Sequence, residues 1–370
     1  MLTSFNDLDD LSLIEVFSYL STVDALWSFS SLNSRLTPIL IERGFYRHVN
    51  SSSIQYHRFQ TFLSLLRLTD IQSLVVECYG SSLQLRFWPH LLVLRTLKVK
   101  YSRDLIEIFN FAQRHANSLT HLSVQSSGYF LTRGITKETC YPTWNLYEFV
   151  SQVFHHLPRL RSVDFGMEQS FFVHTWHTKM SQHHLTYMRI TLITLCDLLC
   201  LMLTQPLSRS LKQLHVCMGT AAIPSFRNVR VKDLWPRMEA LRTFTFAKSF
   251  YWYFDEEWAL IDRITSARVM PILERMNFAI VINNDDLDLM RHSALFNDYR
   301  NVAVHYAFII NDGESHMKLS ECVPRGSQTH PRQIGSAAFV CECLPNNQLF
   351  QTSGESYVSF DFYNYYTLLE

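Results

Sequence analysis

Glycine is scarce in this sequence, with 10 residues among 370, whereas aromatic residues make up 14%. A collagen-like chain needs glycine at every third position, and a disordered chain has few aromatic residues, so this composition excludes both. It is typical of a packed globular protein. At this length the chain can bury a large core, and the usual size of a domain predicts two or three of them.

The sequence also has no excess of charge of one sign, because 33 lysines and arginines balance 33 aspartates and glutamates. A nucleic-acid-binding protein gains most of its affinity from basic side chains that neutralise phosphates. Nothing in the charge balance indicates such a surface. We therefore expect no nucleic-acid partner.

Long apolar runs and targeting signals are missing as well. The most apolar run, residues 190–204, is too short to cross a bilayer comfortably and contains Asp197, so it predicts a buried helix and no membrane partner. The N-terminus carries Asp7, Asp9 and Asp10 without an early basic residue, unlike a signal or transit peptide. The eight cysteines are irregularly scattered. We expect reduced thiols and a cytoplasmic or nuclear location, or both.

The first 45 residues predict a small helical domain. Leu13, Val16, Phe17 and Leu20 recur at the spacing of one helical face, and Leu11 adds a second apolar edge. The stretch STVD, residues 21–24, resembles a capping box that begins a second helix, and a third helix is expected around residues 36–41. A unit of this size has little core of its own. Its surplus apolar side chains therefore indicate contact with something else.

One short phrase recurs through residues 46–280, with the pattern apolar-x-x-apolar-x-apolar. It reads IQSLVV from Ile71, LRTLKV from Leu94, LTHLSV from Leu119, LRSVDF from Leu160, LKQLHV from Leu211, LRTFTF from Leu241 and LERMNF from Leu273. The alternating apolar positions at its end predict a strand with one buried face. Segments with helical periodicity lie between the phrases, for example in residues 104–118 and 145–157.

Strand and helix in regular alternation predict an α/β fold. A doubly wound sheet alternates in the same way, but the phrase shared by the strands favours a solenoid, in which each unit buries its face against the next. Residues 281–370 lose the phrase and are expected to form C-terminal repeats or a cap, with strands in VAVHYAFII, AAFVCEC and YVSFDFY.

The stretch LDDLSLIEVFSYLSTVDALWSFSSLNSRL, near the N-terminus, resembles an F-box. VFSYL at residues 16–20 and STVD match the family closely, and Leu8 stands at the family's leucine. Asp9 and Leu11 occupy the positions of its usual proline and glutamate, and LNSRL replaces its late Cys-Lys-x-Trp element. The array that follows resembles an irregular leucine-rich-repeat domain. The resemblance implies a small three-helix F-box (residues 1–45) followed by a leucine-rich-repeat-like α/β solenoid.

F-box proteins are substrate receptors of Skp-cullin-F-box ubiquitin ligases, so the resemblance implies a Skp-family adaptor and, through it, a cullin-RING scaffold as partners. The chain itself would be a non-enzymatic subunit of protein degradation, without cofactor or metal. The expected adaptor-binding residues are Leu8, Leu11, Leu13, Val16, Phe17, Leu20, Val23 and Leu26. Alternatively, these residues only pack the helices against the first repeat.

Strand alternation predicts which side chains of the array face away from its helices and would contact a protein substrate. They are Lys98, Lys100, His121, Ser123, Asp164, His215, Thr245 and Asn277. The same positions also fit a solvated sheet face without any partner.

Two other functions fit the sequence. In the first alternative, the chain is a repeat scaffold for protein–protein interaction that does not bind the ligase. In the second it is a metal-dependent enzyme built on a histidine cluster, His174, His177, His183 and His184, although no carboxylate or cysteine there completes a familiar ligand set. No phosphate-binding loop or nucleophile elbow occurs in the sequence.

Overall fold

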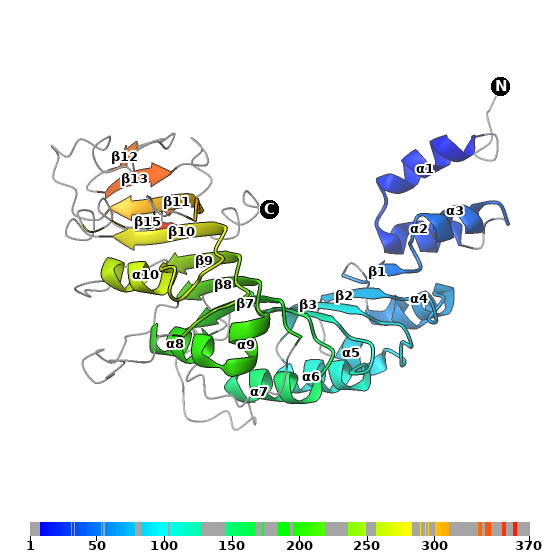
Figure 1. Ribbon diagram of the computed structural model, residues 1–370. Coiled ribbons are helices and arrows are strands. Elements are labelled where there is room, and N and C mark those ends of the chain that lie inside the picture. The colour runs from blue at the N-terminus through cyan, green and yellow to red at the C-terminus, as the bar shows by residue number, and fades with distance from the viewer. Residues whose placement is uncertain are drawn as a thin grey trace, which may run out of the picture. The chain divides into compact units, whose positions relative to one another are not determined.

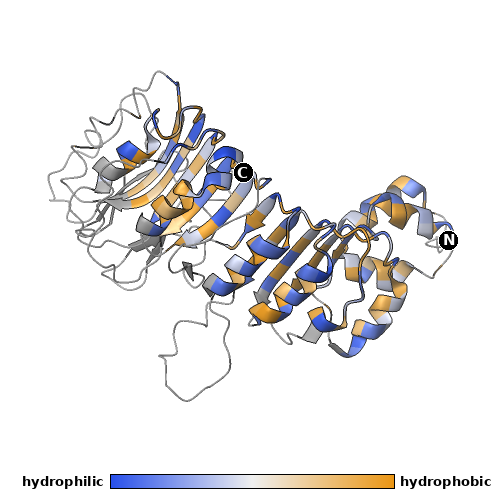
Figure 2. Cartoon of the chain, turned by 60° about the horizontal axis from the view of Figure 1, so that its bottom comes forward, coloured by the Kyte–Doolittle hydropathy of each residue, from blue (hydrophilic) through white to orange (hydrophobic). Residues whose placement is uncertain are grey.

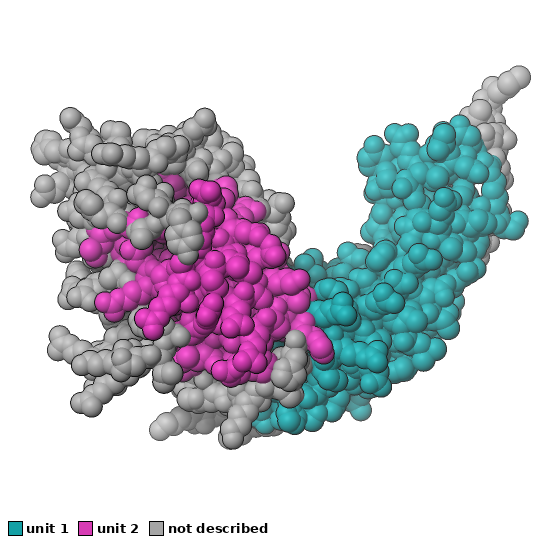
Figure 3. Space-filling view, in the orientation of Figure 1, with its two compact units in different colours: residues 1–127, 135–161 teal, residues 128–134, 162–370 magenta. Residues whose placement is uncertain are grey.

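The structure is a computed structural model. It describes residues 8–30, 32, 34–52, 54, 56–77, 83–102, 104–126, 146–166, 172–173, 184–192, 195–218, 236–248, 257–282, 289, 293, 295, 300–310, 332–334, 337–341, 350–352 and 358–360. The chain divides into two compact units, coloured teal and magenta in Figure 3: unit 1 holds residues 1–127 and 135–161, and unit 2 holds residues 128–134 and 162–370.

Unit 1 begins with three helices and continues with alternating strands and helices (Figure 1). Its elements are α1 (Asp10–Ser18), α2 (Thr22–Phe29), α3 (Leu36–Glu42), β1 (His48–Asn50), a 3-10 turn η2 (Tyr56–Arg58), α4 (Phe59–Leu65), β2 (Ser73–Glu77), α5 (Leu83–Phe87), β3 (Thr96–Ser102), α6 (Leu105–Arg114), β4 (His121–Ser126) and α7 (Leu146–His156). The strands are parallel, and their spatial order β1-β2-β3-β4 is also their order in the sequence.

Unit 2 continues the same alternation. Its elements are β5 (Ser162–Asp164), β6 (Phe172–Val173), β7 (Tyr187–Leu192), α8 (Leu195–Leu203), α9 (Gln205–Ser210), β8 (Gln213–Met218), β9 (Thr243–Lys248), α10 (Glu257–Thr265), β10 (Arg275–Ile282), β11 (Ala303–Ile310), β12 (Arg332–Ile334), β13 (Ala337–Cys341), β14 (Phe350–Thr352) and β15 (Val358–Phe360). Strands β5-β7-β8-β9-β10-β11 are parallel in sequence order, β13 and β12 follow antiparallel, and β14 pairs with β15. The α/β class predicted from the sequence is therefore confirmed.

The recurring phrase marks the start of successive strands, and the same pair of backbone hydrogen bonds occurs at several of these starts in both units. The carbonyl of Gln72 accepts from the N–H groups of Arg95 (2.8 Å) and Thr96 (3.0 Å), two neighbouring residues of the next phrase. The carbonyl of Lys212 accepts in the same way from Arg242 (2.8 Å) and Thr243 (3.1 Å). We call this pattern the strand-start ladder.

The prediction of one buried helix over residues 190–204 is wrong. Residues up to Leu192 belong to β7, and only Leu195–Leu203 are helical, in α8. The strand starts with an eighth copy of the phrase, LTYMRI from Leu185, which divides the long interval between Leu160 and Leu211 into steps of 25 and 26 residues. Parallel strands covered on both faces read as continuous apolar runs, so here the run does not distinguish a strand from a helix.

The core lies between the helices and one face of the strands. In unit 1, strands β2, β3 and β4 contribute alternate residues to this core: Leu74, Val76, Leu97, Val99, Leu122 and Val124. Helices α4 to α7 lie along one side of these strands (Figure 1). In unit 2, Trp258 of α10 packs on Phe278 and Phe308, with ring centroids 5.4 and 6.1 Å away. Hydrophilic and hydrophobic residues accordingly alternate along strands and helices (Figure 2).

Candidate functional site

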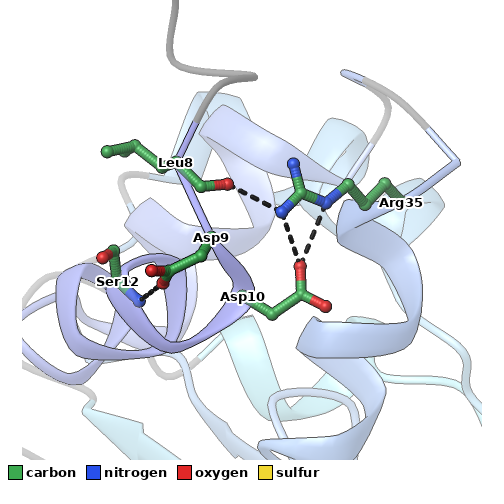
Figure 4. A network of polar contacts seen from close by, with 5 residues as sticks. All are labelled: Leu8, Asp9, Asp10, Ser12 and Arg35. Atoms are coloured by element: carbon green, nitrogen blue, oxygen red, sulfur yellow. Dashed lines mark hydrogen bonds and ion pairs between the residues drawn. The ribbon is translucent and has the colours of Figure 1, made fainter.

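Two side-chain interactions hold the start of α1 (Figure 4). Asp9 is the N-cap residue, and its carboxylate accepts a hydrogen bond from the Ser12 N–H at 2.6 Å, which lowers the pKa of Asp9. Arg35 donates from Nε and Nη2 to Asp10 Oδ1 (3.0 and 2.7 Å) and from Nη2 to the Leu8 carbonyl (2.7 Å). Aspartate is a preferred N-cap residue. The helix therefore starts in an ordered way, with the Asp9 carboxylate as its cap.

Ser21 caps α2, as the stretch STVD predicts. The Ser21 hydroxyl accepts from the Asp24 N–H at 3.1 Å and donates to the Asp24 carboxylate at 2.6 Å. Helix α2 also contacts the first strand, because the Thr22 hydroxyl donates to the His48 carbonyl at 3.2 Å. The helical segment thus packs on β1 through α2, as expected for a unit with little core of its own.

Three of the predicted adaptor-binding residues form the interior of the helical segment. Leu13 and Leu26 are buried and Phe17 is 0% exposed, with its ring 4.9 Å from Phe29 and 6.3 Å from Phe45 between centroids. Expecting these three side chains on an outer surface is wrong. They lie on the side of α1 and α2 that closes against the rest of the segment, and helical spacing alone does not tell which apolar side faces inward.

Apolar side chains remain uncovered on the other side of α1. Leu11 is 77% exposed, Val16 38% and Tyr19, the C-cap residue, 81%. At about 100° per residue, Tyr19 lies about 80° around the helix from Leu11, and Val16 lies about 60° beyond Tyr19. We call them the α1 apolar surface. Tyr19 was missed by the sequence analysis, although its spacing from Leu11 is a signal for it.

The other predicted adaptor-binding residues of the helical segment have an exposure between these extremes. Leu8, Leu20 and Val23 are half-buried. Trp27 on α2 is 41% exposed, and the guanidinium of Arg58 lies 5.6 Å from its ring centroid. Of the predicted set, Leu11 and Val16 therefore lie at the surface. Tyr19 lies there as well. Trp27 is partly exposed to solvent and also contacts the Arg58 guanidinium.

The second predicted surface is the strand face opposite the helices. In unit 1 it carries Lys98, Lys100 and Ser123, all half-buried, and His121, which is exposed. The strand register places Lys98 beside Ser123. Burial and, less strongly, the charge of Arg161 lower the pKa of His121. These four side chains are accessible to a partner.

The same face in unit 2 is different, because Thr245 and Asn277 are buried there. The expectation that these two residues lie on a solvated face is wrong. They are buried in a chain of hydrogen bonds instead. Arg275 Nε donates to Asn277 Oδ1 (3.1 Å), and Asn277 Nδ2 donates to the Thr245 hydroxyl (2.9 Å). That hydroxyl lies 2.8 Å from His215 Nδ1 and is left to donate to it.

The electrostatics agree with a neutral His215. Burial, followed by the charges of Arg189 and Arg275, lowers the pKa of His215 to about 3. Its Nδ1 is then an acceptor for the Thr245 hydroxyl. Asp164 is half-buried, with an oxygen 3.9 Å from Arg189 Nε. Arg189, in the phrase that the sequence analysis missed, thus lies in register between Asp164 and His215.

The alternative of a histidine metal centre is not supported by the described part of the chain. His174, His177 and His183 lie outside the described residues, and His184 is exposed. No group of three potential metal ligands occurs among the residues that are described. In that same part of the chain, no helix has both the length and the apolar character needed to cross a membrane.

No family model matches the chain, and no curated protein matches it significantly.

Proposed function

We propose that this chain is a substrate-recognition adaptor of a Skp-cullin-F-box ubiquitin ligase, in which α1–α3 form the F-box. The observation that carries the proposal is the α1 apolar surface. The inner side of α1 is already closed by Leu13 and Phe17. Leu11 and Tyr19 therefore contribute nothing to the core of the helical segment. Burying one large apolar side chain in a partner contributes about 1.5–3 kcal/mol before the costs of association, so a few suffice for docking.

The array behind the helices supports the substrate-binding half of the proposal. Within each unit the parallel strands follow one another in sequence order, apart from the two-residue strand β6, which pairs with β7 beside this path. A doubly wound sheet reverses its strand order at a switch point, whereas a solenoid adds each repeat beside the preceding one. The strand-start ladder recurs in both units. We therefore interpret residues 46–280 as an irregular leucine-rich-repeat-like solenoid.

The mechanism of such an adaptor is positional. It would hold a substrate lysine close to a ubiquitin thioester carried by another subunit and so raise the effective concentration of the two reactants. No residue of this chain is assigned a covalent or acid–base step.

A scaffold that does not bind the ligase is the second candidate, and one observation favours it. Helix α2 contacts β1, the first strand of unit 1, through Thr22. Repeat arrays need a terminal cap that covers the open face of the first repeat. Capping alone, however, gives no role to the exposed Leu11 and Tyr19.

Binding of the purified full chain to a purified Skp-family adaptor, measured by biolayer interferometry, separates the two candidates. We expect the wild-type chain to bind, and Leu11→Asp and Tyr19→Asp to weaken binding at least tenfold. Leu92→Asp is the matched control, since Leu92 is also an exposed leucine of unit 1. It is expected to bind within twofold of wild type. Phe17→Asp is unsuitable because Phe17 is buried and its loss would unfold the helices. A wild-type chain that does not bind the adaptor would leave the scaffold as the better function.

A further inference from the structure

Strand β3 presents two lysines on the open face of unit 1. Leu97 and Val99 point into the core, so the alternate residues Lys98 and Lys100 lie on the opposite face, where both are half-buried. Two residues along a strand span about 6.6 Å. The two lysines thus belong to one row, in which the strand sets the spacing of their Cα atoms.

The neighbouring strands place one carboxylate beside these lysines. In the register of β2, β3 and β4, Lys98 lies between Val75 and Ser123, and Lys100 lies between Glu77 and Gln125. Over the described part of the chain, the ion pairs are Arg35–Asp10, Arg189–Asp164 and Arg242–Glu274, so neither lysine is paired there.

Arginines add positive charge near the row. Arg47 and Arg95 are exposed and lie at the starts of β1 and β3. Arg95 is three residues from Lys98, about 10 Å along an extended strand, which is slightly more than the Debye length of about 8 Å in physiological salt, so its contribution is larger at low salt. The acidic residue on the open face of β2 to β4 is Glu77, whereas Lys98 and Lys100 on that face and the two nearby arginines are positively charged.

We propose that this face binds an acidic, extended segment of a protein partner, with carboxylates of alternate residues contacting Lys98 and Lys100. An extended peptide repeats its side chains on one side at the same interval of about 6.6 Å, so the two rows match. If the proposed function holds, the segment belongs to the substrate. Unit 2 offers no equivalent row at Thr245 and Asn277, because these side chains are buried and bonded to each other.

Fluorescence anisotropy of the full chain with a labelled peptide of alternating glutamate and serine tests this proposal. We expect saturable binding that weakens as salt is raised, since half-exposed ion pairs are screened. The same peptide with glutamine in place of glutamate is expected to bind at least tenfold more weakly. Lys98→Glu combined with Lys100→Glu is expected to lose at least tenfold in affinity. Lys212→Glu, at an exposed lysine of unit 2, is expected to stay within twofold of wild type.

Three outcomes would overturn the proposal: equal binding of the glutamine peptide, wild-type affinity in the double variant, or tighter binding of a twelve-nucleotide polyuridine that displaces the peptide. Circular dichroism checks the fold of the double variant. If it does not fold, Lys98→Gln with Lys100→Gln replaces it, with an expected loss of at least threefold, and wild-type affinity there overturns the proposal equally.

Adaptor binding by the same variants separates this proposal from the proposed function. The double lysine variant is expected to bind the Skp-family adaptor as wild type does. A chain that binds the acidic peptide but not the adaptor contradicts the ligase role and supports the lysine row. A chain that binds the adaptor but not the acidic peptide contradicts the peptide-binding role of the lysine row and leaves the ligase role unaffected.

Discussion

Replacing His115 by glutamine should make the stability of unit 1 less sensitive to acid. The His115 ring is buried at the end of α6, where its Nε2 accepts the Leu91 N–H at 3.0 Å and its Nδ1 lies 2.8 Å from the Phe111 carbonyl. Since Nε2 accepts, the proton of the neutral ring is on Nδ1 and is donated to Phe111. A second proton on Nε2 would face the Leu91 N–H. Glutamine keeps one acceptor and one donor but cannot titrate.

The magnitude follows from the pKa of this ring. Burial, followed by the charges of His90 and Arg114, lowers the pKa of His115 from 6.5 to about 4. Between pH 6.5 and pH 4 the unfolded chain binds a proton that the folded chain does not, so the free energy of unfolding falls as pH falls. One pKa unit corresponds to about 1.4 kcal/mol. The loss through His115 therefore approaches about 3 kcal/mol at pH 4 and is absent well above pH 6.5.

Urea unfolding of the full chain between pH 7.5 and pH 4.5 measures this effect. His115→Gln is expected to be about 1 kcal/mol less stable than wild type at pH 7.5, because glutamine fits the two hydrogen bonds less well. On acidification to pH 4.5 the difference should shift by about 2.5 kcal/mol in favour of the variant, so that His115→Gln becomes the more stable protein. His57→Gln, at an exposed histidine, controls for the loss of a histidine as such. Parallel stability curves for wild type and His115→Gln over this range would refute the reasoning.

Further predictions concern stability, each measured by urea unfolding at pH 7.5. Phe17→Ala should cost about 3–5 kcal/mol because the ring is buried, whereas Leu11→Ala should change stability by less than about 0.5 kcal/mol; equal effects would contradict the assignment of inner and outer sides of α1. Asp104→Ala should cost about 1 kcal/mol, since Asp104 caps α6 by accepting from the Glu107 N–H at 3.0 Å, and Asp104→Asn should restore most of it. Thr245→Val should cost about 1–3 kcal/mol by leaving buried polar partners unbonded, and a cost no greater than that of Thr245→Ser would be inconsistent with that network.

Much of the fold could be predicted because its signals are local. The phrase from Leu94 and the helical spacing in residues 104–118 each appear within one short window, and both elements are present as β3 and α6. The strand from Tyr187 was missed for a physical reason: its end merges with the apolar helix α8, so periodicity over the joint run is ambiguous.

The candidate surfaces were harder to predict because they depend on which side of an element is covered. Leu13 and Leu11 are both apolar and only two positions apart, yet one is buried and the other exposed. Thr245 and Asn277 are polar and were expected in solvent, but mutual hydrogen bonds offset the cost of their burial. Residue type gives the tendency of a side chain, whereas its neighbours decide its exposure.

The strand-start ladder has a consequence for how this architecture tolerates insertions. In unit 1 the Arg95 carbonyl accepts from the N–H groups of Thr120 and His121, and in unit 2 the Arg242 carbonyl accepts from those of Glu274 and Arg275. The two steps have different lengths, because Leu94 and Leu119 are 25 residues apart and Leu241 and Leu273 are 32 apart. The alignment of neighbouring strands is thus fixed at one end and does not depend on the length of the connection. The connecting segments can therefore gain residues and change the outer surface, while the alignment of the strands that support this surface stays the same.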